Sequence, residues 1–135
     1  MPLHNIKAFF EANDKYAKFN GMKIEEIDVG SAKTSMKIQE HHLNGAGVVH
    51  GGAVFSLADY AFAVASNSHG QLALGINASI SYMKGAKEGE TIFATAKEIN
   101  NSNKLACYNI VICNEKEEIL ASFEGMVYKK NVQIV

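Results

Sequence analysis

The stretch VVHGGAVFSLADYAFAVASN, residues 48–67, decides the fold of this 135-residue chain. Residues 53–65 are almost continuously apolar, which is typical of a helix buried on all sides. Small residues would let a sheet wrap closely around such a helix, and five are present: Ala53, Ala58, Ala61, Ala63 and Ala65. One carboxylate, Asp59, interrupts the segment. An unpaired buried carboxylate is costly, so we expect Asp59 to be paired, protonated, or exposed in a cavity or at an interface.

The residues just before this helix carry groups suited to binding a developing negative charge. Gly51 and Gly52 stand where the helix should begin. A helix N-terminus presents free N–H groups and the positive end of the helix dipole, and glycine lets a ligand approach the backbone. This combination can stabilise an oxyanion, as in acyl transfer. Asn44 and His50 are polar groups placed shortly ahead of it. Asp59 then has two readings: a capped or paired structural group, or a base or nucleophile lining a pocket.

Hydrophobic periodicity predicts the elements around the central helix. Residues 3–19 read as an amphipathic helix that Asn20-Gly21 ends. Six segments read as strands: 22–29, 32–39, 72–85, 91–100, 104–115 and 118–130. The breaks at residues 100–103 and 114–118 look like hairpin turns between antiparallel strands. The pattern predicts an α+β fold in one domain, residues 1–135, with a helix pressed against one face of an antiparallel sheet.

Composition sets limits on the partners of the protein. The formal net charge is −1, which gives no electrostatic reason to expect nucleic acid or an anionic membrane as a partner. The N-terminal sequence MPLHNIKAFFEAND has no long apolar core and carries acids early, unlike a signal peptide. The longest apolar run is too short and too interrupted to span a bilayer. We expect a cytoplasmic protein.

The sequence gives little support for a metal or a disulfide. Cys107 and Cys113 are expected to be reduced, buried thiols. An even separation on a strand puts them on one face but about 20 Å apart, too far to bridge. His41 and His42 are adjacent, so their side chains diverge, and no acid or thiol stands at ligand spacing. We expect no metal and no cofactor.

The segment LNGAGVVHGGAVFSLADYAFAVASNS resembles the signature of hotdog-fold acyl-CoA thioesterases, in particular the phenylacetate-degradation (PaaI-like) branch. The spacing from HGG to the Asp is the specific part, and the later strands and the segment ISYMKGAKEGE also look familiar. The matching positions are Asn44, Gly45, His50, Gly51, Gly52, Phe55, Leu57, Ala58, Asp59, Ala61, Phe62, Asn67 and Ser68.

This resemblance implies a curved antiparallel sheet wrapped around the long helix, and a role for each motif residue. Asp59 would be the general base or the nucleophile, and Gly51 N–H would polarise the thioester carbonyl. Asn44 would help to hold the attacking water or carboxylate, and His50 would shape the site. Some relatives add a Ser or Thr from the strand after the helix, but no position here matches it clearly.

Further residues are expected to contact the substrate. Coenzyme A is part of that substrate, and its phosphates call for basic residues at the entrance, of which Lys84 is the main candidate beside Lys87, Lys104, Lys129 and Lys130. The expected substrate-binding residues are Gly52, Phe55, Asn67, Tyr82 and Lys84.

One chain cannot easily supply a complete site. Gly51 and Asp59 lie eight positions apart, about 12 Å along a helix axis. A reacting carbonyl must sit roughly 3 Å from both the base and the oxyanion donor. Two antiparallel copies of the helix across a two-fold axis would bring Gly51 of one chain to Asp59 of the other. We expect a homodimer with shared active sites, and the resemblance implies a dimer of dimers.

The sequence therefore favours an acyl-CoA thioesterase that hydrolyses a thioester to a free acid and coenzyme A. The acyl group stays open between an aromatic group, such as phenylacetyl or hydroxyphenylacetyl, and a medium-length chain. Two alternatives have the same fold: a non-catalytic acyl-CoA-binding module and, with less support from the motif, a dehydratase acting on hydroxyacyl thioesters. Fold alone does not separate them.

Overall fold

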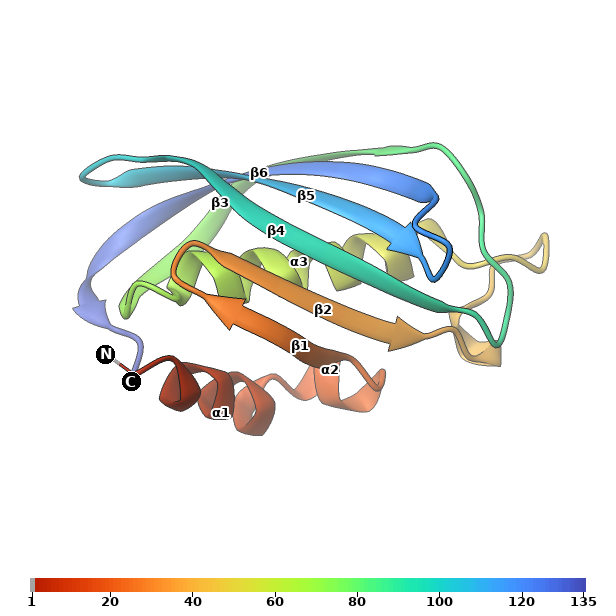
Figure 1. The fold of residues 1–135 in the computed structure, drawn as a ribbon, viewed down its shortest axis with the longest axis horizontal. Helices are drawn as coiled ribbons and strands as arrows, with labels where there is room; N and C mark the ends of the chain where they lie inside the picture. Colours follow the sequence, from red (N-terminus) through yellow and green to blue (C-terminus); the bar gives the residue numbers. More distant parts are fainter. Residues whose placement is uncertain (1) are drawn as a thin grey trace.

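A six-stranded antiparallel sheet curves around one long helix in the computed structural model, which describes residues 2–135 (Figure 1). The helix, α3 (Gly51–Asn67), packs against the concave face of the sheet. The strand order is β1-β2-β4-β5-β6-β3, so β1 and β3 are the two edges. The strands are β1 (Lys23–Asp28), β2 (Ser31–Lys37), β3 (Gln71–Tyr82), β4 (Thr91–Asn101), β5 (Leu105–Asn114) and β6 (Ile119–Gln133). The α+β hotdog architecture expected from the sequence is confirmed.

The core lies between α3 and the sheet because apolar residues alternate along the strands. On β5, residues 106, 108, 110 and 112 are buried while 109 and 111 are exposed. Ala58, Ala61 and Ala65 of α3 have no exposed surface at all. Side chains this small let the sheet approach the helix closely, as the sequence predicted.

The predicted helix over residues 3–19 is divided in two. Helix α1 (Leu3–Asn13) ends before Asp14, and the short helix α2 (Lys15–Phe19) follows it. Asp14 has extended backbone angles (φ −81°, ψ 93°), and its side chain accepts a hydrogen bond from Ala17 N–H. Aspartate is a strong N-cap residue, so it starts a new helix where periodicity alone predicted continuation. Figure 1 shows α1 and α2 beside the edge strand β1.

Other boundaries differ from the prediction by a few residues. Strand β3 stops at Tyr82 rather than at residue 85, and β6 continues to Gln133 rather than to residue 130. A short 3-10 helix, η1 (Glu40–His42), precedes α3. Both predicted hairpins are present, since β4 pairs with β5 and β5 pairs with β6 in antiparallel register.

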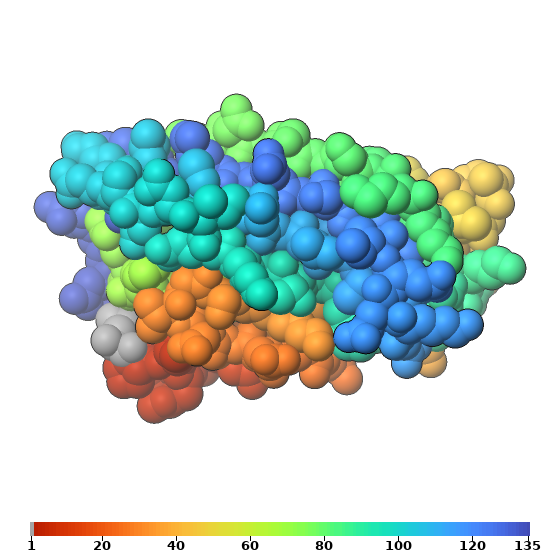
Figure 2. Space-filling view, turned by 45° about the horizontal axis from the view of Figure 1, so that its top comes forward, coloured from red at the N-terminus to blue at the C-terminus, as the bar shows by residue number. Residues whose placement is uncertain are grey.

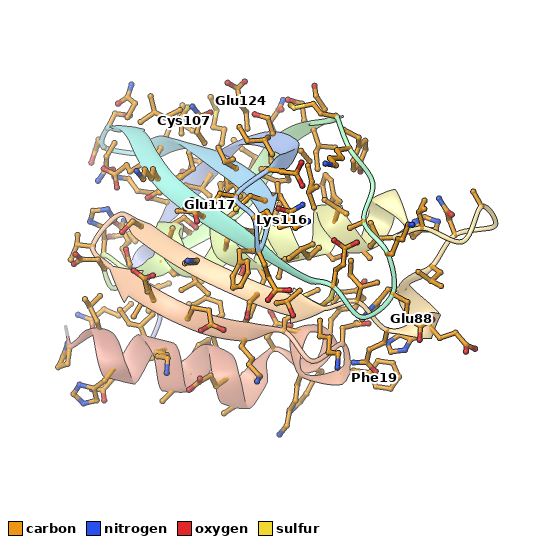
Figure 3. All side chains as sticks on the ribbon, turned by 45° about the vertical axis from the view of Figure 1, so that its right-hand side comes forward. Phe19, Glu88, Cys107, Lys116, Glu117 and Glu124 are labelled. Carbon is orange, nitrogen blue, oxygen red and sulfur yellow. The ribbon has the colours of Figure 1, made fainter. Side chains whose placement is uncertain are left out.

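The two cysteines are less buried than the sequence predicted. Cys107 and Cys113 are free thiols, but both are partly exposed. They alternate with the buried residues of β5 and so lie on its outward face. In Figure 3, Cys107 and Glu124 both project from the side of the sheet that faces away from α3.

Candidate active site

Helix α3 begins with an arrangement that leaves one backbone donor free. His50 is the N-cap, and its Nδ1 accepts a 2.8 Å hydrogen bond from Gly52 N–H. Ala53 and Val54 donate their N–H groups to the carbonyl oxygen of His50. Within residues 2–135, Gly51 N–H has no acceptor at hydrogen-bonding distance. This donor lies at the positive end of the helix dipole and is available to an oxyanion.

The loop before the helix presents a second donor. Asn44 N–H donates to the carbonyl oxygen of Val48, and the Oδ1 atom of Asn44 accepts from Ala46 and Val48 N–H. Its oxygen therefore organises the turn, which Gly47 completes with φ +78°. The Asn44 amide NH₂ group has no bond to any of residues 2–135 and is free to donate to a ligand. This loop stands out from the body of the molecule in Figure 2, at the right in yellow.

A cavity of about 410 Å³ joins four of the predicted site residues. Asn44, Gly51, Tyr82 and Lys84 line it, with apolar side chains between them. The Tyr82 hydroxyl donates a 2.9 Å hydrogen bond to the carbonyl oxygen of Gly51, so this tyrosine holds the helix start. Lys84 forms an ion pair of 2.5 Å with Glu118 and remains about half exposed. We call this space the Gly51 cavity.

Asp59 opens into a different cavity, of about 300 Å³, on the same helix. It is lined by Asp59 and Phe55 of α3 together with Asp14, Tyr16 and Met22 from the N-terminal segment. The Asp59 side chain is exposed within the single chain, whereas Ala58 and Tyr60 on either side are buried. The carboxylate therefore interrupts an apolar sequence without being enclosed in the core. We call this space the Asp59 cavity.

The Asp59 carboxylate takes up a proton more readily in its cavity than it would in water. Although Asp59 keeps exposed surface, partial burial within the cavity raises its pKa, and the negative charge of Asp14 raises it further. The same two causes, with Glu11 added, raise the pKa of Tyr60 to about 12. A carboxylate with a raised pKa is a better proton acceptor than one in water, which suits a general base.

Two predicted residues have positions that differ from the expectation. Asn67 is buried, and its amide donates to the carbonyl oxygens of Ala63 and Ala73 and accepts from Ala73 N–H. It ties the end of α3 to β3 and has no group left for a substrate. Gly52 lines neither cavity, and its N–H is occupied by His50.

The candidate phosphate-binding lysines do not gather in one place. Lys84 lines the Gly51 cavity, while Lys129 pairs with Ala73 at the other end of β3. Lys129 Nζ also donates to Asn101, and Lys104 lies over the Tyr128 ring at 6.0 Å from its centroid. Of the five candidates, only Lys84 lines the Gly51 cavity.

Sequence reasoning missed the contribution of the N-terminal segment. Tyr16 Oη lies 3.0 Å from Ser56 Oγ across 40 positions of sequence, and Ser56 donates to the carbonyl oxygen of Gly52. Asp14 and Met22 line the Asp59 cavity together with Phe55. The one local signal was Asp14 as a capping residue within an otherwise helical pattern.

Among residues 2–135, no group of three or more His, Cys, Asp or Glu side chains is placed to hold a metal ion. None of the helices in that range has the length and apolar character needed to cross a membrane.

Known proteins share the fold and much of the sequence of this chain. The thioesterase superfamily model matches residues 46–121, which include the free Gly51 N–H and Asp59. The acyl-coenzyme A thioesterase PaaI of Escherichia coli is 36% identical over 125 residues, 93% of this chain and 89% of that protein. A putative esterase of Archaeoglobus fulgidus is 46% identical over 129 residues, 96% of this chain and 84% of that protein.

Among solved structures, E. coli PaaI, from the phenylacetic acid degradation operon, superposes with a TM-score of 0.95 at 32% identity, covering 98% of this chain and 96% of that one. The fold is thus the hotdog fold of the PaaI structures. The chain belongs to the thioesterase superfamily, in its PaaI-like branch, and it is a thioester hydrolase. The resemblance recognised in the motif is confirmed.

Proposed function

We propose that the protein hydrolyses an acyl-CoA thioester to a free acid and coenzyme A. The observation that carries this proposal is the free Gly51 N–H at the start of α3, where the next three N–H groups are all occupied. A fixed donor of this kind stabilises charge that develops on the thioester oxygen, and removing one typically costs about 10²–10³ in rate. The activity named for E. coli PaaI supports the same reaction.

The chemistry assigned to the two cavities follows from their groups. The thioester carbonyl oxygen accepts from Gly51 N–H, and the Asn44 amide donates to the attacking water or to the carboxylate. Asp59 either removes a proton from water as it attacks, or attacks the carbonyl itself to form an anhydride that water then cleaves. The thiolate of coenzyme A leaves when the tetrahedral intermediate collapses. His50 holds the helix N-terminus through Gly52.

The complete site is shared between two chains of a homodimer. Gly51 and Asp59 lie in separate cavities of one chain, eight positions apart on a straight helix, or about 12 Å. The 12-residue strand β3 is an edge of the sheet, and Leu74, Ile76 and Tyr82 on it are large, exposed apolar residues. An exposed edge strand of this kind can pair with a strand of a second chain. Antiparallel pairing of two β3 strands would set two α3 helices side by side, each N-terminus near the other chain's Asp59.

Mixing inactive variants tests the shared site. Asp59→Asn removes the base, and Gly51→Pro removes the N–H at a helix position where proline is tolerated. Because a Cβ at position 51 would lie 3.1 Å from the Tyr82 ring, Asn44→Ala serves as a second variant of the Gly51 cavity. Hybrids of Asp59→Asn with either variant contain one intact site, so activity should return. Hybrids that stay as inactive as their parents would contradict sharing. Native mass spectrometry of the wild type separates a dimer from the expected dimer of dimers.

A thiol-release assay tests the reaction itself. We expect wild type to release coenzyme A from at least one of phenylacetyl-CoA, hydroxyphenylacetyl-CoA and the medium-chain acyl-CoAs. Asp59→Asn should lose activity by orders of magnitude while its circular dichroism spectrum and melting temperature stay close to wild type. A wild type that binds these thioesters without releasing coenzyme A would instead be an acyl-CoA-binding module, and the hydrolase proposal would fail.

A further inference from the structure

The Asp59 cavity is unusual in the charge of its lining. Two of the nine residues that line it are carboxylates, Asp14 and Asp59, and none is Lys, Arg or His. Nearby Lys15 does not line the cavity, and its Nζ atom lies 3.4 Å from the carbonyl oxygen of Ala12. Glu11, in the turn before Asp14, has its carboxylate 3.4 Å from Lys7. Within the described chain, therefore, no cationic side chain lines the cavity to balance its two negative charges.

The rest of the lining is apolar or carries hydroxyl groups, of which those of Tyr16 and Ser56 are engaged and that of Tyr60 makes no hydrogen bond within residues 2–135. Phe55, Met22 and Ala63 supply apolar surface. The hydroxyl groups of Tyr16 and Ser56 bond to each other, and Ser56 also donates to a backbone carbonyl. A carboxylate inside this cavity would find no cationic side chain in the lining, and the Tyr60 hydroxyl could replace only part of its water.

The cavity adjoins the atom that would carry out the reaction. A thioester carbonyl attacked by Asp59, or by water held there, must lie roughly 3 Å from the reacting oxygen. The acyl group that extends from this carbonyl then lies against the Asp59 cavity, while the rest of the thioester extends toward the Gly51 cavity of the other chain. This placement rests on the proposed function.

We infer that Asp14 is a specificity-determining residue, which restricts the enzyme to acyl groups without a negative charge. An acyl group ending in a carboxylate places a third negative charge beside Asp14 and Asp59. Like charges a few ångströms apart in partly desolvated surroundings repel strongly. Neutral aromatic and aliphatic acyl groups gain from the apolar wall instead.

Asp14 can be neutralised without removing its structural role. Its side chain caps α2 by accepting from Ala17 N–H at 3.0 Å. Asparagine caps helices about as well as aspartate. Asp14→Asn therefore keeps the hydrogen bond and the shape of the cavity and removes one charge. Asp28→Asn is the matched control, because Asp28 Oδ1 also accepts a backbone N–H, from Val29, in the exposed turn between β1 and β2, and does not line the Asp59 cavity.

The test compares three thioesters of one shape. The acyl group of 5-methylhexanoyl-CoA is neutral and apolar, that of glutaryl-CoA carries a carboxylate in place of the terminal isopropyl group, and that of 4-carbamoylbutanoyl-CoA is the uncharged amide. We expect wild type to prefer the apolar thioester over glutaryl-CoA by at least about 100-fold in kcat/KM, since charge and desolvation both oppose the carboxylate. Asp14→Asn should raise the ratio of glutaryl to amide by about tenfold, and Asp28→Asn should leave it unchanged.

The possible outcomes separate this inference from the proposed function. Equal hydrolysis of glutaryl-CoA and 5-methylhexanoyl-CoA by wild type overturns the inference and leaves thioester hydrolysis standing. An unchanged ratio of glutaryl to amide in Asp14→Asn, with an unaltered circular dichroism spectrum, overturns the role of Asp14. If coenzyme A is released neither from these thioesters nor from phenylacetyl-CoA, hydroxyphenylacetyl-CoA and the medium-chain acyl-CoAs, the proposed function itself fails, and the inference fails with it.

Discussion

Tyr82, at the end of β3, holds the backbone of Gly51, at the start of α3. Its hydroxyl donates a 2.9 Å hydrogen bond to the Gly51 carbonyl oxygen. Its ring approaches so closely that a Cβ at position 51 would lie 3.1 Å from Cζ. Glycine is therefore required at this position for packing against Tyr82 as well as for the chemistry of its N–H. The contact fixes the residue whose N–H is the candidate oxyanion donor.

Removing the Tyr82 hydroxyl should slow catalysis more than it weakens binding. In Tyr82→Phe the ring still fills its place, but the Gly51 backbone loses its hydrogen bond and its N–H is held less firmly. We expect kcat to fall by about tenfold with little change in KM, because small misplacements of catalytic groups are costly. Steady-state kinetics on the best acyl-CoA substrate measures both constants.

Tyr128→Phe is the control for this change. Tyr128 pairs with Leu74 at the other end of β3 and lines neither cavity. The same loss of one hydroxyl there should leave kcat unaltered. If Tyr82→Phe raises KM and spares kcat, Tyr82 acts on the substrate and does not position Gly51.

The acid side of the pH profile should report the charge of Asp14. The reaction needs an ionised Asp59, so kcat/KM should fall as the pH drops through the Asp59 pKa. Burial and then the Asp14 charge raise that pKa above its ordinary value of 3.8. Asp14→Asn removes a neighbouring negative charge, lowers the pKa, and should move the acid limb to lower pH. Asp28→Asn should not move it, and an upward shift in Asp14→Asn would refute the assignment.

Local signals made much of this fold predictable from its sequence. The apolar run over residues 53–65 identified the central helix, and the turn residues near 101 and 116 identified two hairpins. Asp59 could be singled out because it is a carboxylate in an apolar run. These features depend on residues close together in the chain, where periodicity and turn preferences act.

The rest depended on contacts between distant segments. Asp14 falls within residues 3–19, which periodicity predicted to be one helix, yet it ends α1 and lines the Asp59 cavity. Asn67 looked like a binding residue within a motif, yet its amide donates to the carbonyl oxygen of Ala63 and accepts a hydrogen bond from Ala73 N–H. No periodicity reveals which partner a polar side chain finds once the chain is folded.

The Glu98 carboxylate should stabilise the fold in a pH-dependent way. Burial alone would raise the pKa of Glu98, but hydrogen bonds from His69 and Tyr108, with the charges of His69 and Lys129, outweigh it and lower the pKa. A group whose folded pKa is lowered stabilises the protein above its unfolded pKa, near 4.5, and this contribution is lost as the pH falls through the folded value.

Glu98→Gln should therefore lower the free energy of unfolding by about 1 kcal/mol at pH 7. The difference from wild type should shrink as the pH falls below the ordinary glutamate value, because wild type then loses its own charge. Urea unfolding at several pH values measures it. Glu124→Gln, on the exposed outward face of β6, is the control (Figure 3). A Glu98→Gln deficit that stays constant down to pH 3 would contradict the ionic origin.

The ring of Phe62 should make glycine necessary at position 125. Phe62 lies on α3 with 2% of its surface exposed, and a Cβ at Gly125 of β6 would sit 2.6 Å from its Cζ. No Cβ fits at that distance, so in Gly125→Ala the ring or the strand must shift. Overpacking of this kind costs about 1–3 kcal/mol, and we expect the melting temperature to fall by roughly 5 °C or more.

A second substitution tests whether the ring is the cause. Phe62→Leu removes the ring atoms nearest Gly125 and leaves space that the added methyl group of Gly125→Ala can fill. The double variant should therefore be less destabilised than the sum of the two single variants, by about 1 kcal/mol or more. Gly45→Ala is the control, since a Cβ there meets nothing within 4 Å and should leave stability nearly unchanged. Additive effects in the double variant, measured by thermal and urea unfolding, would show that Gly125 is constrained by something other than Phe62.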